Sequence, residues 1–309
     1  MSKILSVDVG GTKILYSVLD EKGNFLTEIK RLSTPKNINE LINIFKNIIN
    51  SYEREIDAIA FATAGAVNLS NTRVESSTPN MPKGYNSLDF TTLTNKPVYI
   101  ENDANAAAWA EYKTGAAKGE NNTITITLGT GVGGGFIVDG RLLRGKSGRA
   151  GETGHIKING RNRRCNCGGK NCFESYASGT GLKITAQETA QFDEIFQSSI
   201  YKNKLPDDIT TYDIIEGVKQ KDSYSIKVFN IWKHDIITGL ICLTNIFDPE
   251  SIIISGGMGE FLNYEEIEKA VNSENVVSPV KIKPARSGNY SGMIGAALLA
   301  YEKLLYNKK

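Results

Sequence analysis

The chain has 309 residues, and 36 Lys and Arg against 34 Asp and Glu leave a formal net charge of +2, which argues against a protein that coats nucleic acid and against a polybasic membrane patch. With 40% hydrophobic and 23% charged residues the composition is that of a soluble globular protein, and the longest apolar run, 236–247, falls short of the roughly 18 residues of a membrane span. Lys3 and Asp8 interrupt the N-terminal apolar segment, so we expect no secretory signal and a cytoplasmic location, and the length favours two domains.

Strands and helices are predicted to alternate through the first third of the chain. Apolar runs bounded by turn residues predict strands, and apolar residues recurring every three or four positions predict helices. The predicted strands cover 3–9, 14–20, 25–32, 56–62 and 98–101. The predicted helices cover 37–52 and, in an Ala-rich segment, about 104–114.

A similar order of elements begins again near residue 123. Strands are predicted over 123–128, 136–139 and 251–255, and helices over about 229–247, where Pro249 follows, and about 291–305. Each half therefore starts with a strand, a glycine turn and a second strand, which predicts two α/β lobes with a cleft between them. We expect a small lobe over 1–118, completed by the C-terminal helix within 291–309, and a large lobe over 119–290.

The first glycine turn, Asp8-Val9-Gly10-Gly11-Thr12-Lys13, joins two predicted strands. Glycines let the backbone approach a phosphate closely, and the Thr hydroxyl and the turn N–H groups can donate to it. Asp8 ends a strand, where a carboxylate can orient Mg²⁺ or its water shell. A glycine-rich hairpin turn with a capping Asp gives the same pattern, so this motif alone leaves both interpretations open.

Two further glycine segments follow. The segment 129–135 has five glycines in seven residues, which costs backbone entropy and favours close approach of a ligand over a plain turn. Gly256 and Gly257 stand between a predicted strand and the next helix, where N–H groups attract anions and missing side chains leave room for a flat base. A purely structural junction there is an almost equal alternative.

A carboxylate, a carboxamide and a second carboxylate, Glu101-Asn102-Asp103, stand where a strand gives way to a helix, and Asn105 follows. Asp103 can serve as the helix N-cap. It can also accept a proton from a substrate hydroxyl during phosphoryl transfer. An N-cap needs only one polar residue, so the cluster favours the second interpretation.

Three of the four cysteines, Cys165, Cys167 and Cys172, lie within eight residues, and His155 precedes them in Gly151-Glu152-Thr153-Gly154-His155. Three thiolates and one imidazole complete a closed tetrahedral Zn²⁺ site without an open position for a catalytic water. Such a site would be structural and would hold Glu152, His155 and Glu174 in register. Buried free cysteines without metal are the alternative.

Together these motifs resemble the ROK family of sugar kinases, within the two-lobed actin/hexokinase-type (ribonuclease H-like) α/β ATPase fold. The resemblance covers nearly the whole chain, with the motifs in the same order, and it depends most on 152–155 with 165–174. The chain departs from the family pattern at Asn171, where Gly is usual. That position is not a metal ligand, so the departure concerns only the local turn.

The resemblance implies ATP with Mg²⁺, a structural Zn²⁺ and a sugar substrate. The residues that would bind the nucleotide are Asp8, Gly10, Gly11, Thr12, Lys13, Thr130, Gly131, Gly133, Gly256 and Gly257. The residues that would line the sugar pocket are Gly65, Thr78, Asn102, Asp103, Glu152, His155 and Glu174. Asp103 would be the base that accepts the proton of the sugar 6-hydroxyl, and His155 would bind Zn²⁺ with one nitrogen and a sugar hydroxyl with the other.

The identity of the sugar depends on a short segment, Ala62-Thr63-Ala64-Gly65-Ala66-Val67. Many glucokinases of the family have Gly-x-Pro-Gly-Pro-Val there, whereas the Thr-Ala-Gly form and Trp109 look more like N-acetylmannosamine kinases. We therefore expect phosphorylation of N-acetylmannosamine, with glucose as the alternative substrate.

A sugar-sensing transcriptional regulator is the alternative of a different class, because some members of the family are repressors. Those carry a winged-helix region ahead of the first phosphate loop, which begins here at Asp8, and the chain has no basic recognition helix. We therefore expect an enzyme without nucleic-acid or membrane partners, acting as a homodimer.

Overall fold

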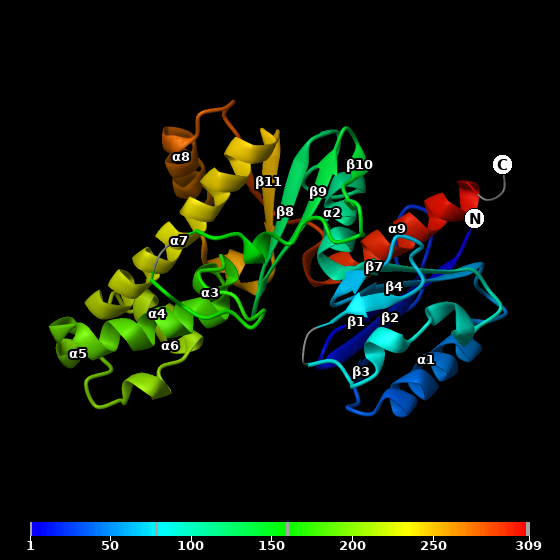
Figure 1. Cartoon of the computed structure of the whole chain (residues 1–309), viewed down its shortest axis with the longest axis horizontal. Coiled ribbons are helices and arrows are strands. Elements are labelled where there is room, and N and C mark those ends of the chain that lie inside the picture. Colours follow the sequence, from blue (N-terminus) through cyan, green and yellow to red (C-terminus); the bar gives the residue numbers. More distant parts are fainter. Residues whose placement is uncertain (1, 78–79, 159–160, 307–309) are drawn as a thin grey trace. The chain divides into compact units, whose positions relative to one another are not determined.

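The computed structural model describes residues 2–77, 80–158 and 161–306, which form alternating strands and helices (Figure 1). The chain divides into two compact units. Unit 1 consists of Met1–Thr125, Gly135–Gly151 and Ala285–Lys309, and unit 2 of Ile126–Gly134 and Glu152–Pro284. The lobe boundaries drawn from the sequence stay a prediction.

The core of unit 1 is a five-stranded sheet of order β3-β2-β1-β4-β7. Its strands are β1 (Ile4–Val9), β2 (Lys13–Leu19), β3 (Lys30–Ser33), β4 (Ala58–Thr63) and β7 (Val98–Asn102). β2 is antiparallel to β1 and β3, whereas β1, β4 and β7 are parallel. The register pairs Val9 with Thr63 and Thr63 with Asn102, so the carboxyl ends of three strands meet at one edge of the sheet.

Helices cover both faces of this sheet. Successive side chains of a strand point to opposite faces, so β1 packs against a helix on each side. Leu5 and Val7 pack into an apolar cluster with α1 (Ile38–Tyr52). Ser6 points the other way, and its Oγ donates to Met293 O of α9 (Ser291–Tyr306) at 2.7 Å. Figure 1 shows α1 and α9 on opposite sides of the sheet. The remaining elements before residue 120 are β5 (Ala66–Val67), β6 (Val74–Ser76), α2 (Asp103–Lys113) and the 3₁₀ turns Tyr85–Ser87 and Phe90–Leu93.

A second five-stranded sheet has the order β10-β9-β8-β11-β12. Its strands are β8 (Thr123–Leu128), β9 (Val132–Val138), β10 (Arg141–Leu142), β11 (Ser251–Ser255) and β12 (Lys281–Pro284). The helices of unit 2 are α3 (Glu174–Ala177), α4 (Gly179–Phe192), α5 (Glu194–Ser198), α6 (Thr211–Lys219), α7 (Ser223–Phe247) and α8 (Tyr264–Glu274). Short 3₁₀ turns cover Thr153–His155, Pro206–Asp208, Gly257–Phe261 and, in unit 1, Gly288–Tyr290.

The long helix α7 packs against the chain where α3 ends in unit 2. Trp232 has no exposed surface, and its indole N–H donates to Ala177 O at 2.9 Å and Ser178 O at 3.1 Å. The helix ends at Asp248, which adopts a left-handed conformation with φ 43° just before Pro249. A residue in this conformation is a common helix terminator, and proline cannot continue the helix.

Two sequence-based element predictions are wrong in part. The strand predicted over 25–32 is confined to β3 at Lys30–Ser33, and Phe25 makes only an isolated bridge with Leu19. The turn predicted over 129–135 ends earlier, since β9 already begins at Val132. Gly135 therefore lies in a strand, where a Cβ atom would lie 2.7 Å from Ala104 O of α2. This glycine allows close packing of a helix rather than a turn.

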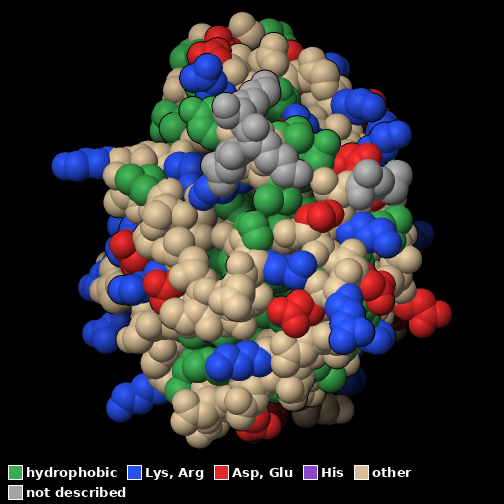
Figure 2. All heavy atoms as spheres, turned by 90° about the vertical axis from the view of Figure 1, so that its right-hand side faces the viewer, with side chains coloured by type: hydrophobic (Ala, Val, Ile, Leu, Met, Phe, Trp, Pro, Cys, Tyr) green, Lys and Arg blue, Asp and Glu red, His purple; other side chains and the backbone are tan. Residues whose placement is uncertain are grey.

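The surface carries both signs of charge. Figure 2 shows Lys and Arg side chains interspersed with Asp and Glu over the face that it presents. Among the helices in the described part of the chain, none has both the length and the apolar character needed to cross a membrane.

Candidate functional site

Asn102 and Asp103 occupy the junction between β7 and α2 in unit 1. Asn102 is the N-cap: its Oδ1 accepts from Ala104 N at 2.9 Å and Asn105 N at 3.1 Å. The N-cap interpretation of Asp103 is therefore wrong, because the cap is the last extended residue before the helix and Asp103 is already helical. Asp103 is thus the first helical residue at the carboxyl edge of the sheet.

Gly65 lies beside this junction. The Asn102 side chain donates from Nδ2 to Gly65 O at 3.0 Å. Gly65 has φ +109°, and a Cβ there would lie 2.2 Å from Ser76 O, so only glycine fits. The structure thus brings together two of the predicted sugar-pocket residues, whereas Thr78 lies outside the described residues.

Asp8 is the penultimate residue of β1 and interacts electrostatically with Asp103 in the same unit. Burial raises the pKa of Asp8 to about 7, the Asp103 carboxylate adds to the rise, and Lys13 opposes it. A bound cation would lower the cost of ionising Asp8 beside the Asp103 carboxylate. This environment therefore suits a carboxylate that orients Mg²⁺. α9 begins beside Asp8, since a Cβ on Gly292 would lie 3.3 Å from Asp8 Oδ2.

The turn Gly10–Lys13 is tightly closed. Gly10 N donates to Lys13 O at 3.0 Å, and Thr34 Oγ1 donates to Gly10 O at 2.6 Å. A Cβ on Gly11 would lie 2.6 Å from Asn80 Cβ, so this glycine is required by packing as well as by any ligand. The hairpin interpretation and the phosphate-loop interpretation are therefore compatible.

In unit 2, the glycine turn after β8 contacts Glu174. Val132 N donates to Glu174 Oε2 at 3.0 Å, and a Cβ on Gly131 would lie 2.4 Å from the same oxygen. Thr180 Oγ1 donates to Thr130 O at 2.8 Å, and Gly133 N donates to Thr127 Oγ1 at 3.1 Å. The absence of a side chain at Gly131 therefore leaves space that the Glu174 carboxylate occupies.

The strand-to-helix junction after β11 lies against the same β8 turn. Gly256 has φ +87°, and a Cβ there would lie 2.3 Å from Leu128 O. A Cβ on Gly257 would meet no heavy atom within 4 Å. The backbone of Gly257 is therefore open on one side, which suits a site for a flat group.

The cluster of three cysteines and His155 forms a compact set of potential metal ligands. One ligand atom from each of His155, Cys165, Cys167 and Cys172 lies within 4.8 Å of the others. His155 Nδ1 is 3.8 Å from Cys165 Sγ, and Cys167 Sγ is 3.6 Å from Cys172 Sγ. Zn–S bonds of about 2.3 Å in a tetrahedron place sulfurs about 3.8 Å apart, so the spacing fits zinc.

One carboxylate lies near His155 and another near Cys165. The other ring nitrogen, His155 Nε2, is 3.8 Å from Glu152 Oε2, and Glu174 Oε1 is 3.8 Å from Cys165 Sγ. His155 can therefore offer Nδ1 to a metal and Nε2 to the side on which Glu152 lies. Glu152, His155 and Glu174 all belong to unit 2, and their common role in a sugar pocket stays a prediction.

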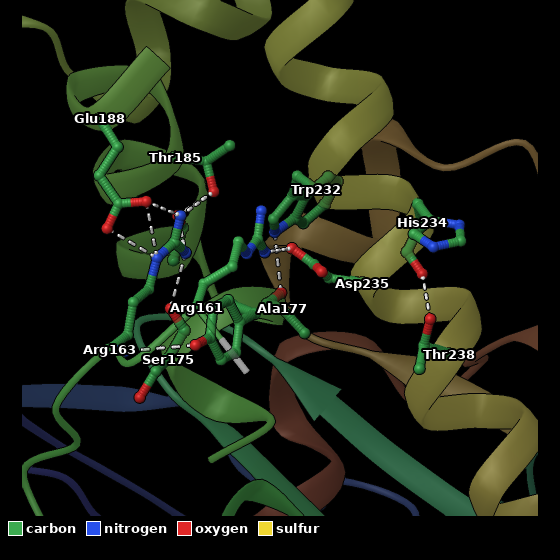
Figure 3. Close-up of polar contacts among 12 residues, drawn as sticks. Arg161, Arg163, Ser175, Ala177, Thr185, Glu188, Trp232, His234, Asp235 and Thr238 are labelled. Atoms are coloured by element: carbon green, nitrogen blue, oxygen red, sulfur yellow. Dashed lines mark hydrogen bonds and ion pairs between the residues drawn. The ribbon is translucent and has the colours of Figure 1, made fainter. Parts of the chain in front are cut away.

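The polypeptide around the cysteines is held by a buried arginine. Arg163 donates from Nη1 to Ser175 O at 3.0 Å and from Nη2 to Thr185 Oγ1 at 2.8 Å and Glu188 Oε2 at 2.7 Å (Figure 3).

Asn171 has φ +58°, a left-handed conformation that Asn tolerates better than most residues. Asn171 therefore keeps the kind of turn for which the family pattern usually has Gly.

A cavity of about 890 Å³ lies along α7. Its lining includes Arg161, His234, Asp235 and Thr238, which Figure 3 shows on and beside α7. None of the predicted site residues lines it. Arg161 forms an ion pair with the nearly buried Asp235, so the main charges of this cavity are already paired.

Two residues that contact the strand ends have no motif that selects them from the sequence. Tyr85 is fully buried, its Oη is 2.6 Å from Thr63 Oγ1, and burial raises its pKa. Arg144 contacts Glu101 and Asn71. Tyr85 lies in a short 3₁₀ turn and Arg144 in an irregular segment, and only the folded chain brings them to the edge of the sheet.

Comparison with known proteins gives consistent matches over almost the entire chain. The profile of the ROK family matches residues 4–303. A glucokinase of Streptomyces coelicolor is 34% identical, covering 98% of both chains, and an N-acetylmannosamine kinase of Yersinia pestis is 30% identical, covering 98% of this chain and all of the other. The crystal structure of a ROK family glucokinase from Streptomyces griseus with glucose and AMPPNP superposes with a TM-score of 0.78 at 30% identity, covering 97% of this chain and all of the other.

Proposed function

Since the chain belongs to the ROK family and has the actin/hexokinase-like fold of its kinases, we propose that it transfers the γ-phosphoryl group of ATP to the 6-hydroxyl of a hexose. The observation that carries the proposal is the position of Asp103. It begins α2 at the carboxyl edge of the sheet, beside Asp8 and the Gly10–Lys13 turn.

Asp103 would act as the general base. It would accept the proton of the sugar 6-hydroxyl as the new O–P bond forms and the bond to the departing ADP oxygen breaks. Asp8 would hold Mg²⁺ or its water shell, and this ion supplies neutralisation of the phosphate charge when bound. Holding both reactants in line provides much of the remaining rate enhancement.

The nucleotide would bind along the glycine segments. Gly10 to Lys13 in unit 1 and Thr130, Gly131 and Gly133 in unit 2 would contact its phosphates through backbone N–H groups. Gly256 and Gly257 would lie against the adenosine. The open face of Gly257 supports this part of the proposal.

The sugar would bind to residues that both donate and accept hydrogen bonds. Gly65, Asn102 and Asp103 in unit 1, with Thr78, and Glu152, His155 and Glu174 in unit 2 suit vicinal hydroxyls. His155, Cys165, Cys167 and Cys172 would hold a structural Zn²⁺, which leaves no position for a catalytic water. This arrangement would fix the ring of His155 and the Glu174 carboxylate.

We propose N-acetylmannosamine as the substrate. The segment 63–66 has small side chains, and an N-acetyl group needs volume and an apolar surface for its methyl. Glucose is the second candidate, and the 34% identity to a Streptomyces glucokinase favours it. We further propose that the protein acts in the cytoplasm as a homodimer.

A panel of hexoses and N-acetylhexosamines tests the proposal through sugar-dependent release of ADP. A kinase gives ADP only with the sugars that it phosphorylates. A sugar-sensing regulator binds sugar without turnover, so binding without ADP release from any sugar would contradict the proposed activity.

We expect kcat/KM for N-acetylmannosamine to exceed that for glucose by roughly tenfold or more. A site that pairs the acetamide carbonyl and N–H leaves the protein partners of these groups unpaired when glucose binds, at a cost of about 1–3 kcal/mol each. Parallel steady-state assays on the two sugars measure the ratio. A clear preference for glucose would reverse the choice of substrate and leave the kinase proposal standing.

Gly131→Ala is expected to raise the sugar KM by about tenfold, as the loss of one good hydrogen bond would. The new Cβ would lie 2.4 Å from Glu174 Oε2, at the flexible end of that side chain, so the carboxylate must move. The melting temperature should change little, since no backbone is displaced. Glu174→Gln should act in the same direction, and an unchanged sugar KM in both variants would remove Glu174 from the pocket.

A further inference from the structure

Glu101 is a buried carboxylate two residues before the proposed base Asp103. It has no exposed surface, yet it lies at the end of β7 next to Asn102 and Asp103. A buried carboxylate is costly unless it is paired and fully hydrogen-bonded. Its partners therefore indicate what the charge is used for.

One oxygen of Glu101 holds the turn that carries Asp103. Glu101 Oε1 accepts from Asn102 N at 2.9 Å and from Asn105 Nδ2 at 3.1 Å. Asn102 in turn caps the helix through Ala104 N and Asn105 N. Glu101 thus contacts both ends of the four-residue segment 102–105, and Asp103 lies between those ends.

The other oxygen of Glu101 is held by Arg144. Arg144 Nη2 forms an ion pair with Glu101 Oε2, Nη1 donates to Asn71 Oδ1 at 2.6 Å, and Tyr99 Oη donates to Glu101 Oε2 at 3.2 Å. The Arg144 side chain is only 20% exposed, so this pair is largely shielded from solvent. A guanidinium with two nitrogens on two different partners fixes orientation in a way that a single ammonium cannot.

Asn71 completes the arrangement. It is buried in a left-handed conformation with φ 59°, and its Nδ2 donates to Ile100 O at 2.7 Å while Ile100 N donates to Asn71 O at 3.2 Å. Arg144 is therefore tied to the backbone of β7 through Asn71 as well as to the carboxylate of Glu101. Three chain segments, at 71, 101 and 144, meet around one ion pair.

We propose that Arg144 and Glu101 are positioning residues that hold Asp103 and Asn102 in the geometry needed for proton transfer. The inference rests on the proposed kinase function for its catalytic part only. Glu101 contacts the backbone N–H of Asn102 and the side chain of Asn105, and Arg144 sets the orientation of Glu101. A displacement of the base by about 1 Å is enough to lower a rate by about 100-fold.

Arg144→Met tests this, because it keeps much of the side-chain volume and leaves Glu101 without its cation. We expect kcat at 25 °C to fall by about 10- to 100-fold. We also expect faster amide hydrogen exchange at Asn102, Ala104 and Asn105, since their hydrogen bonds depend on Glu101 and Asn102. Arg144→Lys should restore part of kcat, because an ammonium keeps the charge but not both contacts.

Arg149→Met is the matched control. Arg149 lies in the same segment and pairs with Glu75 at 2.9 Å, but both side chains are more than 40% exposed. This variant should keep the kcat of the unaltered chain and its exchange at 102–105. The melting temperature of every variant is measured so that rates are compared well below unfolding.

A purely structural role for Arg144 would lower the melting temperature and leave kcat and exchange at 102–105 unchanged, and that result would overturn the inference. If the unaltered chain phosphorylates no sugar, the kinase proposal fails instead. Hydrogen exchange still decides in that case whether Arg144 holds the 102–105 segment, so the two failures are distinguishable.

Discussion

Asp103→Asn should lower kcat for sugar phosphorylation by about 100- to 10,000-fold, the range that positioned general bases contribute. The carboxamide has nearly the same shape, and its oxygen can still accept from Ala104 N, which lies 2.9 Å from Asp103 Oδ1. It cannot take up the hydroxyl proton. The protein should therefore remain folded and still bind its sugar.

The comparison requires kcat, sugar affinity and melting temperature for this variant and for Asp139→Asn. Asp139 lies exposed in the turn after β9 with φ 49°, a conformation that Asn tolerates, so its variant should keep normal turnover. Near-normal turnover by Asp103→Asn would contradict the assignment of the base.

One Zn²⁺ per chain is expected by elemental analysis of protein purified without added metal. Cys167→Ser should lose this metal, because it removes one of four ligand atoms that lie within 4.8 Å of one another. We expect a loss of about 3 kcal/mol or more in the free energy of unfolding, since metal loss belongs to the strongly destabilising changes. For a chain of this size that corresponds to a melting temperature lower by about 5 °C or more.

Sugar binding should weaken in the same variant, because the metal would orient His155 and the polypeptide that carries Glu174. Cys242→Ser is the control: Cys242 lies on α7 outside the cluster and is only partly buried. It should keep both the metal and the activity. An active, stable protein that contains no zinc would contradict the metal proposal.

The sequence predicted the elements best where a short apolar run is bounded by glycine or polar residues. Strands 123–128 and 251–255 coincide with β8 and β11, because all but one residue of these runs is buried and turns follow both. The segment 25–32 also contains apolar residues but carries Glu28, Lys30 and Arg31, and apart from a bridge between Phe25 and Leu19 it pairs with β2 only from Lys30 on. Strand pairing depends on a neighbour that local pattern does not reveal.

Glycine was the least specific signal within the predicted site. Gly65 and Gly256 have positive φ angles, whereas Gly135 lies in a strand and makes room for α2. The same residue type thus serves backbone conformation at two positions and helix packing at the third. Only the neighbouring atoms distinguish these uses.

The cluster of potential metal ligands was predictable because its three cysteines are close in sequence. Arg144 and Glu101 were not, since 43 residues separate them and neither belongs to a spacing pattern that implies contact. The same is true of Tyr85 and Thr63. Residues that position a site through long-range contacts become apparent only once the fold is known.

The most direct test of the account is the fate of the phosphoryl group. The protein is incubated with ATP, Mg²⁺ and the sugar that the panel selects, and the products are followed by ³¹P NMR. The account predicts one ADP per sugar phosphate, with the new phosphate ester coupled to the two hydrogens on C6. ATP hydrolysis without a sugar phosphate, or a phosphate on another hydroxyl, would contradict it.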